Sequence, residues 1–559
     1  MAFIVKKNIH GKEYYYLNEN KRVNGKVKTK TLAYLGKTRK DAEKKAREII
    51  DSKIKNANDK SEKFESTKIS IEDLAVFCKR KGFVFPSGEI YGGFSGFWDL
   101  GPLGIELFNN IKQSWWKFFV QGRKNMVGID ASVISHPKTW KASGHVENFS
   151  DVSVKCKKCK KFNKIDKQEL SYAKCGFCHG DLDKESAKDL NLMFTVQIGP
   201  IKEDSIISYL RPETAQGMFL NFKNVVNTSR IRLPFGIAQI GKCFRNEIAP
   251  RDFLFRSREF TIAEFEFFIN PEEEKCEILD EKHLGLKIRI LDAETQFMKK
   301  KDLKEITIGK MLEEKKLGEW HAYWLAEQIL WLKNLGLDMN RIKIREHMKD
   351  ELSHYSSATF DVDYEYSFGS KEIAGNSNRG VYDLNQHIKE SGEKLEIFDE
   401  KTQKSVVPKV IEPTFGMERI FLAVLSQAYF YDEKRQNIVL KINPKLSPIK
   451  ASIFPIVKKP EFEKIAKDVF DLLKEEWNVS HDKSGSIGRR YARNDEIGTP
   501  FCITIDEDSS KNKDVTIRER DTTKQIRVKI SQLKDVLKKL ISQEIRFEKA
   551  GKIFKGKIS

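Results

Sequence analysis

Two runs of alternating apolar and polar residues, separated by a short loop, constrain the fold of this 559-residue chain more than any other feature. The runs extend from Ile237 to Ile269, and the loop spans Ile248 to Phe253. Alternation with a period of two is the pattern of a half-buried β-strand, and a short connection favours antiparallel pairing. The sequence therefore predicts an antiparallel strand pair here.

On such a strand pair, a period of two gathers polar side chains on one face. Arg245 and Glu247 share a face of the first strand, and Arg256 adds a second arginine. The second strand brings four side chains together: Phe260, Ile262, Glu264 and Glu266. Arginine forks suit phosphates, a ring can stack on a purine, and carboxylates can take an ammonium group or a metal ion. An ion-paired surface strand explains the same pattern about equally well.

Composition narrows the class of partner. The net charge of +20 suits a polyanion, meaning nucleic acid or an anionic membrane face, although a solvated charge-rich surface is the plainer explanation. The N-terminal apolar run is too short for a signal peptide, and none approaches the ~20 residues of a membrane helix. Eight cysteines, dispersed apart from one cluster, argue against a disulfide framework and for the cytoplasm.

Periodicity and composition divide the chain into four regions. The large central region combines strands with helices, so its expected class is α+β. We expect the following regions: a basic N-terminal unit of β-hairpin and helix at 1–60, a large mixed domain at 68–442 with a helical insertion at 272–350, an α/β module at 448–546, and a basic tail at 547–559. In the first unit, Val5–Leu17 and Val27–Leu35 are expected strands, 40–54 an expected helix and 55–66 a linker.

Four cysteines have the spacing of a zinc ribbon. Cys156-x-x-Cys159 is followed after fifteen residues by Cys175-x-x-Cys178, within an insert at 152–182. Four thiolates leave no open coordination position, so the expected Zn²⁺ is structural. His179 is a less favoured spare ligand, and four unrelated buried thiols are the alternative.

The strand pair and a second segment together resemble a known class of enzyme. Arg245-x-Glu247, the loop and Arg256-x-x-x-Phe260 are similar to the second signature motif of the class II aminoacyl-tRNA synthetases, and Glu412–Arg419 is similar to the third. Within that class the chain resembles the homodimeric glycyl-tRNA synthetases of eukaryotic and archaeal type, from about residue 68 to 545. Supporting stretches are Tyr91–Pro102, His136–Trp140, Asn191–Pro200, Arg211–Gly217 and Ser484–Gly498.

This resemblance implies a fold and a function. The fold would be an antiparallel-sheet catalytic domain with zinc-ribbon and helical insertions, followed by an α/β anticodon-binding domain. The function would be glycine–tRNA ligase activity: glycine and ATP form glycyl-adenylate, and the glycine passes to the 3′ end of tRNA-Gly. Mg²⁺ would serve as a cofactor, and the enzyme would be a cytoplasmic homodimer with no membrane partner.

The resemblance also assigns residues to ATP. Arg245 would bind the α-phosphate, Arg256 the γ-phosphate and Arg419 the ATP from the other side, and these three would be the catalytic groups. Phe260 would stack on adenine, and Glu372 would touch ATP and its Mg²⁺. The complete expected ATP set is Arg245, Asn246, Glu247, Phe255, Arg256, Ser257, Arg258, Glu259, Phe260, Glu372, Ile373, Gly416, Met417, Glu418 and Arg419.

A neighbouring acidic pocket would hold glycine. Glu213, Glu264 and Glu412 match the family's three carboxylates for the ammonium group, which leave no room for a Cβ. Thr414 replaces the family's usual Ser, and its extra methyl is expected to tighten the exclusion of alanine; the departure at Ala358–Asp361 has no explanation. The complete expected glycine set is Lys164, Glu213, Phe260, Thr261, Ile262, Ala263, Glu264, Glu412, Pro413, Thr414, Phe415 and Gly416.

Two other functions stay open from the sequence. A catalytically inactive relative that binds RNA or assists a polymerase would have lost the motif arginines, all of which this chain keeps. A synthetase for threonine, proline or histidine would lack the Arg211–Gly217 block. The N-terminal unit, with lysines interleaved with Tyr14, Tyr15 and Tyr16, is either an RNA-gripping hairpin or a solvated strand pair.

Overall fold

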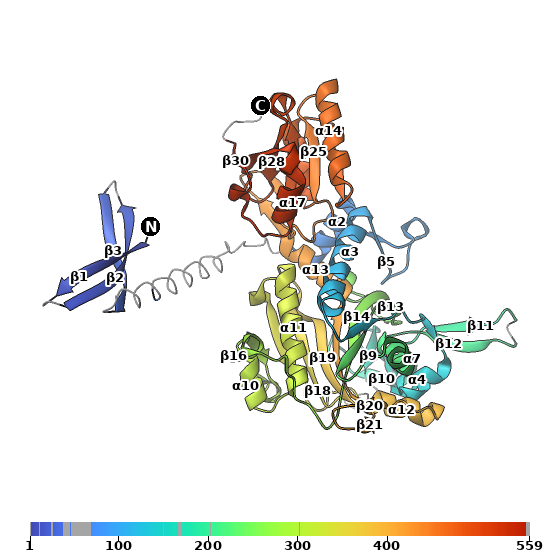
Figure 1. The fold of residues 1–559 in the computed structure, drawn as a ribbon. Helices are drawn as coiled ribbons and strands as arrows, with labels where there is room; N and C mark the ends of the chain where they lie inside the picture. The colour runs from blue at the N-terminus through green and yellow to red at the C-terminus, as the bar shows by residue number, and fades with distance from the viewer. Residues whose placement is uncertain are drawn as a thin grey trace. The chain divides into compact units, whose positions relative to one another are not determined.

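The computed structural model divides the chain into two compact units, Met1–Glu65 and Ser66–Ser559. We describe each unit by itself (Figure 1). The structure describes residues 2–9, 12–23, 26–36, 45, 69–148, 150–165, 170, 173–201, 203–300 and 302–554.

The N-terminal unit contains a three-stranded antiparallel sheet. Its strands, β1 (Ala2–Ile9), β2 (Lys12–Val23) and β3 (Lys26–Gly36), pair in chain order. The expected two-stranded hairpin is therefore wrong: Val5–Leu17 is two strands, because the chain reverses between Ile9 and Lys12. Tyr15 and Leu35 are buried in this unit. The expected helix at 40–54, apart from Lys45, and the linker lie outside the described residues.

A nine-stranded sheet forms the centre of the second unit. Its order is β16-β15-β17-β18-β19-β22-β14-β13-β6, and all neighbours are antiparallel except β15 with β17 and β13 with β6. The strands are β6 (Met126–Gly128), β13 (Phe235–Phe244), β14 (Glu259–Ile269), β15 (Lys287–Leu291), β16 (Lys304–Thr307), β17 (Ile342–Glu346), β18 (Ala358–Tyr366), β19 (Gly369–Gly380) and β22 (Lys409–Gly416). The predicted strand pair is confirmed as β13 and β14, which lie between β22 and the edge strand β6.

Three helices cover one face of the sheet (Figure 1): α3 (Pro102–Trp116), α11 (Glu319–Leu335) and α13 (Met417–Ala428). The core between them is aromatic. Phe119 lies within 6 Å, ring to ring, of Trp115, Phe265 and Phe415, all fully buried. Gly104 lets α3 approach closely, since a Cβ there would meet the Phe83 carbonyl oxygen at 1.8 Å.

Alternation along β14 separates this core from the functional face. Ala263, Phe265 and Phe267 point into the aromatic core under the helices. Glu264 and Glu266 therefore point to the opposite face, because successive side chains alternate. Further along that face, Phe268 belongs to a second apolar cluster under α6 (Ala215–Leu220) and α7 (Phe222–Ser229).

Residues 272–350 are not simply a helical insertion, so this expectation is wrong. They include α8 (Glu281–Leu284), α9 (Ala293–Phe297), α10 (Ile308–Glu313) and α11, but also β15, β16 and β17 of the central sheet. Strands of four or five residues are too short for periodicity to distinguish them from helix. Pairing with β18 decides the outcome, because Ile342 and Ile344 alternate into the buried side of the sheet.

Smaller elements complete the catalytic region. The cysteine insert has strands β8 (Ser150–Cys156), β9 (Phe162–Ile165) and β10 (Leu182–Asn191), and a projecting hairpin of β11 (Thr195–Ile198) and β12 (Ile206–Leu210) follows it. The others are α2 (Ile71–Lys81), β4 (Val84–Pro86), β5 (Trp98–Leu100), β7 (Ile134–Ser135), α4 (Pro137–Ala142), α5 (His145–Asn148), α12 (Tyr382–Ser391), β20 (Ile397–Asp399), β21 (Lys404–Val406), β23 (Tyr429–Asp432) and β24 (Asn437–Leu440).

The C-terminal residues form a sheet with its own hydrophobic core. The strand order is β26-β25-β27-β28-β29-β30, with parallel pairing of β25 to β26 and β27. Its elements are β25 (Ala451–Pro455), α14 (Pro460–Leu473), β26 (Val479–His481), α15 (Ile487–Glu496), β27 (Phe501–Ile505), α16 (Glu507–Asn512), β28 (Asp514–Glu519), β29 (Gln525–Lys529), α17 (Leu533–Ile541) and β30 (Lys552–Ile553). No helix among the described residues is long and apolar enough to cross a membrane.

Candidate active site

The connection between β13 and β14 carries the arginines expected to bind ATP. Because β13 ends at Phe244 and β14 begins at Glu259, Arg245, Glu247 and Arg256 lie off the strands. The expected strand-face placement of Arg245 and Glu247 is therefore wrong. Hydrogen bonds within the loop gather these residues instead: Arg256 Nε donates to Glu247 Oε2 at 3.0 Å, and the Arg245 amide donates to the Arg258 carbonyl at 2.9 Å.

A cavity of about 580 Å³ opens between this loop and the central sheet. It is lined by Arg245, Glu247, Leu254, Phe255, Arg256, Ser257, Phe260, Thr261, Ile262, Lys343, Arg345, Asp361, Asp363, Ser370, Lys371, Glu372, Thr414, Gly416, Glu418 and Arg419. Thirteen of the residues predicted from sequence are in this set. The structure thus brings residues from β14, β17, β18, β19, β22 and α13 to one place.

Several predicted residues do not line the cavity. Ala263, Ile373, Phe415 and Met417 are buried in the aromatic core, because each occupies the alternate position of its strand or the inner face of α13. Asn246, Arg258, Glu259 and Pro413 lie beside the cavity rather than on its wall, and Arg258 instead donates to the Glu247 and Ser95 carbonyls. The side chain of Lys164 lies outside the described residues.

The cavity arginines are already held in position by neighbouring groups. Arg419 Nη1 donates to Glu372 Oε2 at 2.9 Å, and its guanidinium lies 4.5 Å from the centre of the Phe255 ring. The Arg245 guanidinium lies 5.3 Å from the centre of the Phe260 ring. Charge-assisted bonds and cation–π contacts reduce the freedom of long side chains. The cavity therefore presents oriented cations and an aromatic ring to an anionic, aromatic ligand.

Strands β17 and β18 supply the far wall of the cavity, whose residues were not predicted from the sequence. Arg345 Nη2 and His347 Nε2 each lie 2.8 Å from Asp361 Oδ2. Asp363 pairs with Glu372 across β18 and β19, and burial raises the pKa of Asp363 to about 6. The alternation Asp361-Val-Asp363 was a usable signal, but the expected helical insertion at 272–350 obscured the neighbouring strand β17.

A second, fully buried cluster of carboxylates adjoins the cavity through Thr414. The Thr414 hydroxyl lies 3.3 Å from Glu264 Oε2 and 3.2 Å from Glu412 Oε1. The Thr214 amide donates to Glu264 Oε1 at 2.8 Å. Thr214 begins the short helix α6 within the Arg211–Gly217 block, so that block positions one wall of the pocket.

Arg379 supplies the positive charge of this cluster. Its guanidinium donates to Glu412 Oε2 at 2.9 Å and to both oxygens of Asp383 at 2.8 Å, and one nitrogen lies 3.8 Å from Glu213 Oε1. His145 Nε2 also lies 3.2 Å from Glu213. No motif marked Arg379 or Asp383 in the sequence, since their value arises where β19 meets α12.

Two of the three pocket carboxylates, Glu213 and Glu264, differ in their affinity for a proton because their surroundings differ. Burial and the charges of Glu412 and Glu213 raise the pKa of Glu264 to about 8. Burial also raises the pKa of Glu213, but His145 and Arg379 outweigh it and hold that pKa well below its usual range. The pocket thus contains a firmly ionised carboxylate beside one that readily takes a proton or a cation.

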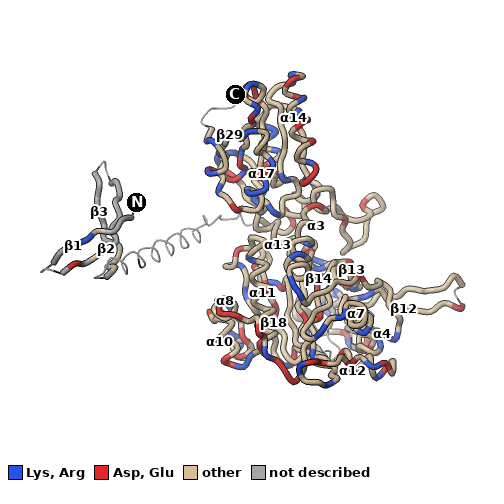
Figure 2. The backbone as a smooth tube through the Cα atoms, in the orientation of Figure 1, with Lys and Arg blue, Asp and Glu red and all other residues tan. Residues whose placement is uncertain are grey.

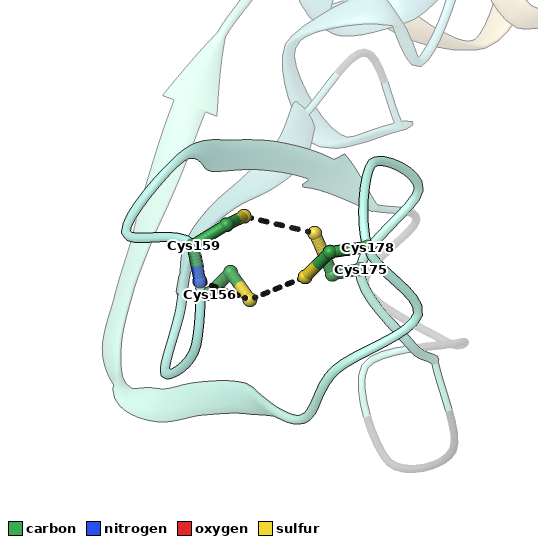
Figure 3. Close-up of side chains that lie close together, drawn as sticks. All are labelled: Cys156, Cys159, Cys175 and Cys178. Atoms are coloured by element: carbon green, nitrogen blue, oxygen red, sulfur yellow. Dashed lines mark hydrogen bonds between the residues drawn. The ribbon is translucent and has the colours of Figure 1, made fainter.

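The cysteine insert brings its four sulfur atoms together (Figure 3). Cys156 Sγ lies 3.5 Å from Cys178 Sγ, and Cys159 Sγ lies 3.5 Å from Cys175 Sγ. The four atoms all lie within 4.8 Å of one another, and none is in a disulfide. The amides of Cys159 and Phe177 donate to Cys156 and Cys175 sulfurs at 3.4 Å, as in a metal-binding knuckle.

Comparison with known proteins identifies the class of enzyme to which the chain belongs. Residues 194–428 match the family model "tRNA synthetase class II core domain (G, H, P, S and T)", and residues 450–540 match "Anticodon binding domain". A prolyl-tRNA synthetase structure from Cryptosporidium parvum has the same fold, with a TM-score of 0.52 at 14% identity over 84% of this chain and 77% of that one. The fold and the site define a class II aminoacyl-tRNA synthetase, as predicted.

Sequence relatives narrow the class to one family. The chain is 40% identical to the glycine–tRNA ligase of Bifidobacterium longum, over 85% of this chain and 93% of the relative. It is 39% identical to that of Treponema denticola, over 84% of this chain and 96% of the relative. The chain belongs to the glycine–tRNA ligase family, which confirms the predicted resemblance. Both relatives are bacterial, and the eukaryotic or archaeal type stays a prediction.

The N-terminal unit has a separate similarity. Residues 4–66 match a family model described as the N-terminal domain of the IS1634 family transposases. This match covers the three-stranded sheet and ends where the second unit begins.

The raised pKa of Glu264 predicts a pH dependence of stability. Between about pH 4.5 and 8 the folded chain binds a proton that an unfolded glutamate has released, so the free energy of unfolding falls as pH rises through this range. Glu264→Gln removes one such group and should make the fall shallower, by at most about 1.4 kcal/mol per pH unit. Denaturant unfolding at several pH values measures it, with exposed Glu313→Gln as the control. Equal slopes for wild type and Glu264→Gln would refute the assignment.

Proposed function

We propose that this chain activates glycine with ATP and transfers the glycyl group to the 3′ end of tRNA-Gly. One observation carries the proposal. A cavity with fixed arginines and an aromatic ring joins, at Thr414, a buried cluster of carboxylates formed by Glu264, Glu412 and Glu213. The first part suits ATP and the second suits the ammonium group of glycine.

The arginines perform the chemistry by position and charge. Arg245 would hold the α-phosphate and Arg256 the γ-phosphate. Arg419, which lies on α13, would contact the nucleotide from the other side, and Phe260 would stack on adenine. The glycine carboxylate attacks the α-phosphorus in line and pyrophosphate leaves, so no covalent enzyme intermediate and no general base are needed. Preoriented cations stabilise the charge that develops on the phosphoryl oxygens.

Mg²⁺ fits the acidic wall of the same cavity. Glu372 on β19 and Asp363 on β18 are register partners, so their backbones are adjacent, and both line the cavity. Carboxylate oxygens are the ligands that Mg²⁺ prefers, together with phosphate oxygens of a bound nucleotide. When bound, the ion would neutralise charge on the leaving pyrophosphate.

Glycine would be selected by charge and by lack of space. Its ammonium group would be surrounded by Glu213, Glu264 and Glu412. Thr414 would narrow the pocket further, because threonine carries a methyl group that serine lacks. A pocket that sterically rejects a larger substrate discriminates strongly, whereas one that only lacks a contact discriminates weakly. This favours glycine over alanine and serine without an editing step.

Amino-acid-dependent exchange between ATP and pyrophosphate tests the function. We expect exchange with glycine and not with alanine or serine. Arg245→Ala should lower the glycine-dependent rate by about 10²- to 10³-fold, because it removes a cation at the developing charge, while tRNA binding persists. Arg232→Ala, an exposed ion-paired arginine away from the cavity, is the control. Absence of exchange with every amino acid would instead favour the inactive RNA-binding relative.

The four cysteines fit a structural zinc ion. A tetrahedral site with Zn–S bonds of about 2.3 Å has sulfur–sulfur separations of roughly 3.8 Å, close to the 3.5 Å seen between the two sulfur pairs. Four sulfur ligands fill the coordination sphere, so the ion would fix the insert rather than act on substrate. His179 is not needed as a ligand.

Metal analysis should find one zinc per chain in protein purified without chelator. Cys175→Ser should reduce bound zinc and destabilise the insert, because one of four ligands is lost. Cys502→Ser, a buried cysteine of the C-terminal domain, is the matched control and should keep its zinc. Wild-type protein without zinc would contradict the assignment.

The tRNA would contact two regions of the chain, the C-terminal domain and the first 60 residues. The C-terminal domain matches an anticodon-binding model, and Lys and Arg are interspersed with acidic residues across it (Figure 2). The first 60 residues contain 17 Lys and Arg against 7 Asp and Glu, so they hold half of the net charge of +20. Such a density of cations favours contact with a nucleic-acid backbone over a neutral structural role.

Deleting residues 1–60 should weaken tRNA binding and flatten its dependence on salt. Each phosphate contact that is lost lowers the slope of log affinity against log salt by roughly 0.7 to 0.9. Binding titrations of the full and shortened chains at several salt concentrations measure this, and glycine-dependent pyrophosphate exchange reports that the shortened enzyme stays folded. An unchanged slope would exclude an RNA-binding role for this unit.

The chain would act as a cytoplasmic homodimer. Ile198, Ile206 and Ile207 on the β11–β12 hairpin and Ile134 beside it are each more than two-fifths exposed, which a second subunit could cover. Trp115 lies entirely in the core of its own chain and offers no surface to a second subunit. Light scattering of the full chain decides the question, since a monomer mass would contradict the dimer.

A further inference from the structure

Glu266 lies beneath the proposed glycine pocket and has no part in the mechanism above. It is two residues beyond Glu264 on β14, so both side chains project from the same face. The β14–β22 register pairs Glu264 with Thr414 and Phe267 with Ile411, which places Glu266 opposite Glu412. The residue is fully buried.

When Glu264 and Glu412 are both ionised, as binding of an ammonium group requires, the hydrogen bonds of the pocket leave one donor too few. Thr414 has a single hydroxyl proton, yet its oxygen lies within 3.3 Å of both Glu264 Oε2 and Glu412 Oε1. Thr214 serves the other Glu264 oxygen, and Arg379 serves the other Glu412 oxygen. One carboxylate oxygen therefore has to find a further donor.

Glu266 is placed to be that donor. Neither of its carboxyl oxygens has a hydrogen-bond partner among the described residues, although both are buried. Carboxyl oxygens of Glu264, Glu266 and Glu412 lie within 4.8 Å of one another. Three ionised carboxylates at this separation, away from water, would repel one another strongly, so the cluster keeps a proton.

The charged groups around Glu266 favour its neutral form. Burial raises its pKa well above the usual range, followed by the charge of Glu412. Arg379 opposes this rise, while Glu264 and Asp383 add to it. Arg379 is already engaged with Asp383 and Glu412, so it is not available to pair with Glu266.

We propose that Glu266 is a positioning residue: as a neutral carboxylic acid it donates a hydrogen bond to Glu412 and fixes the direction in which that carboxylate faces the ammonium group of glycine. Because Glu266 then donates to Glu412, the Thr414 hydroxyl can donate to Glu264. Glu264 and Glu412 would each direct an oxygen toward the ammonium group of glycine. The inference rests on the proposed function, because glycine is the ligand that it positions.

Two substitutions distinguish a hydrogen-bonding role of the Glu266 side chain from a role of its size or its negative charge. Glu266→Gln keeps the shape and an N–H donor but cannot ionise, whereas Glu266→Met keeps the length and offers no donor. We expect Glu266→Met to raise the KM for glycine by about tenfold, which is the loss of one hydrogen bond to a charged group, with the KM for ATP little changed. Glu266→Gln should keep glycine binding within about threefold of wild type.

Infrared spectroscopy provides a readout that packing does not affect. With glycine bound at pH 7, when Glu264 is ionised, the wild-type protein should show the carbonyl band of a protonated buried acid. This band should be missing or reduced in Glu266→Gln. Thermal unfolding of each variant reports whether it folds. If Glu266→Met does not fold, Glu266→Gln is compared with wild type alone, and a rise of tenfold or more in its KM for glycine contradicts the proposal.

Two outcomes overturn the proposal. If Glu266→Gln loses glycine binding as Glu266→Met does, the residue acts through a negative charge, as a cation ligand would. If both variants bind glycine like wild type, Glu266 only fills space. Failure of the proposed function is distinguishable, because the wild-type protein itself would then show no glycine-dependent exchange.

Discussion

The guanidinium of Arg379 lies wholly inside the catalytic region, where three carboxylates, Glu213, Asp383 and Glu412, surround it. Taking an arginine out of water is costly unless it is fully paired, and the bonds to Asp383 and Glu412 provide that pairing. The same charge permits the acidic pocket to exist, since without it Glu213 and Glu412 would be buried beside each other uncompensated. Loss of one member of such a buried network costs about 3–5 kcal/mol, so the pocket and the fold around it are stabilised by the same contact.

The central sheet turns this electrostatic arrangement into a site. Residues of β14 and β22 alternate between an aromatic core and the cavity, so Phe265 and Phe415 anchor the strands that present Glu264 and Thr414 on the other face. A close-packed core fixes backbone positions to a fraction of an ångström. The precision that glycine selection requires therefore comes from aromatic packing under α3, α11 and α13 rather than from the polar residues themselves.

The motif residues could be read from the sequence, but their arrangement could be read only in part. The period of two in 237–269 predicted the β13–β14 pair and the shared face of Glu264 and Glu266. It wrongly extended the strands through Arg245, because a loop held by hydrogen bonds carries no periodic signal. Arg379 and Asp363 were missed for a different reason: their roles depend on strands brought together from distant parts of the chain. Within 272–350, short strands gave too few residues for any period to be distinguished from helix.

The distance between the arginine loop before β14 and Glu264 on that strand affects which amino acids the site could accept. The arginine loop lies at the start of the strand and Glu264 lies further along it, with alternate side chains on one face spaced roughly 7 Å apart. Under the proposed function, a ligand whose ammonium and carboxylate are separated by a single carbon would reach Glu264 while its carboxylate faced the nucleotide. A longer separation would push the carboxylate past the phosphate, and a side chain would meet Thr414. The spacing of the strand would thus select an α-amino acid, and the position of Thr414 between Glu264 and Glu412 would select glycine among them.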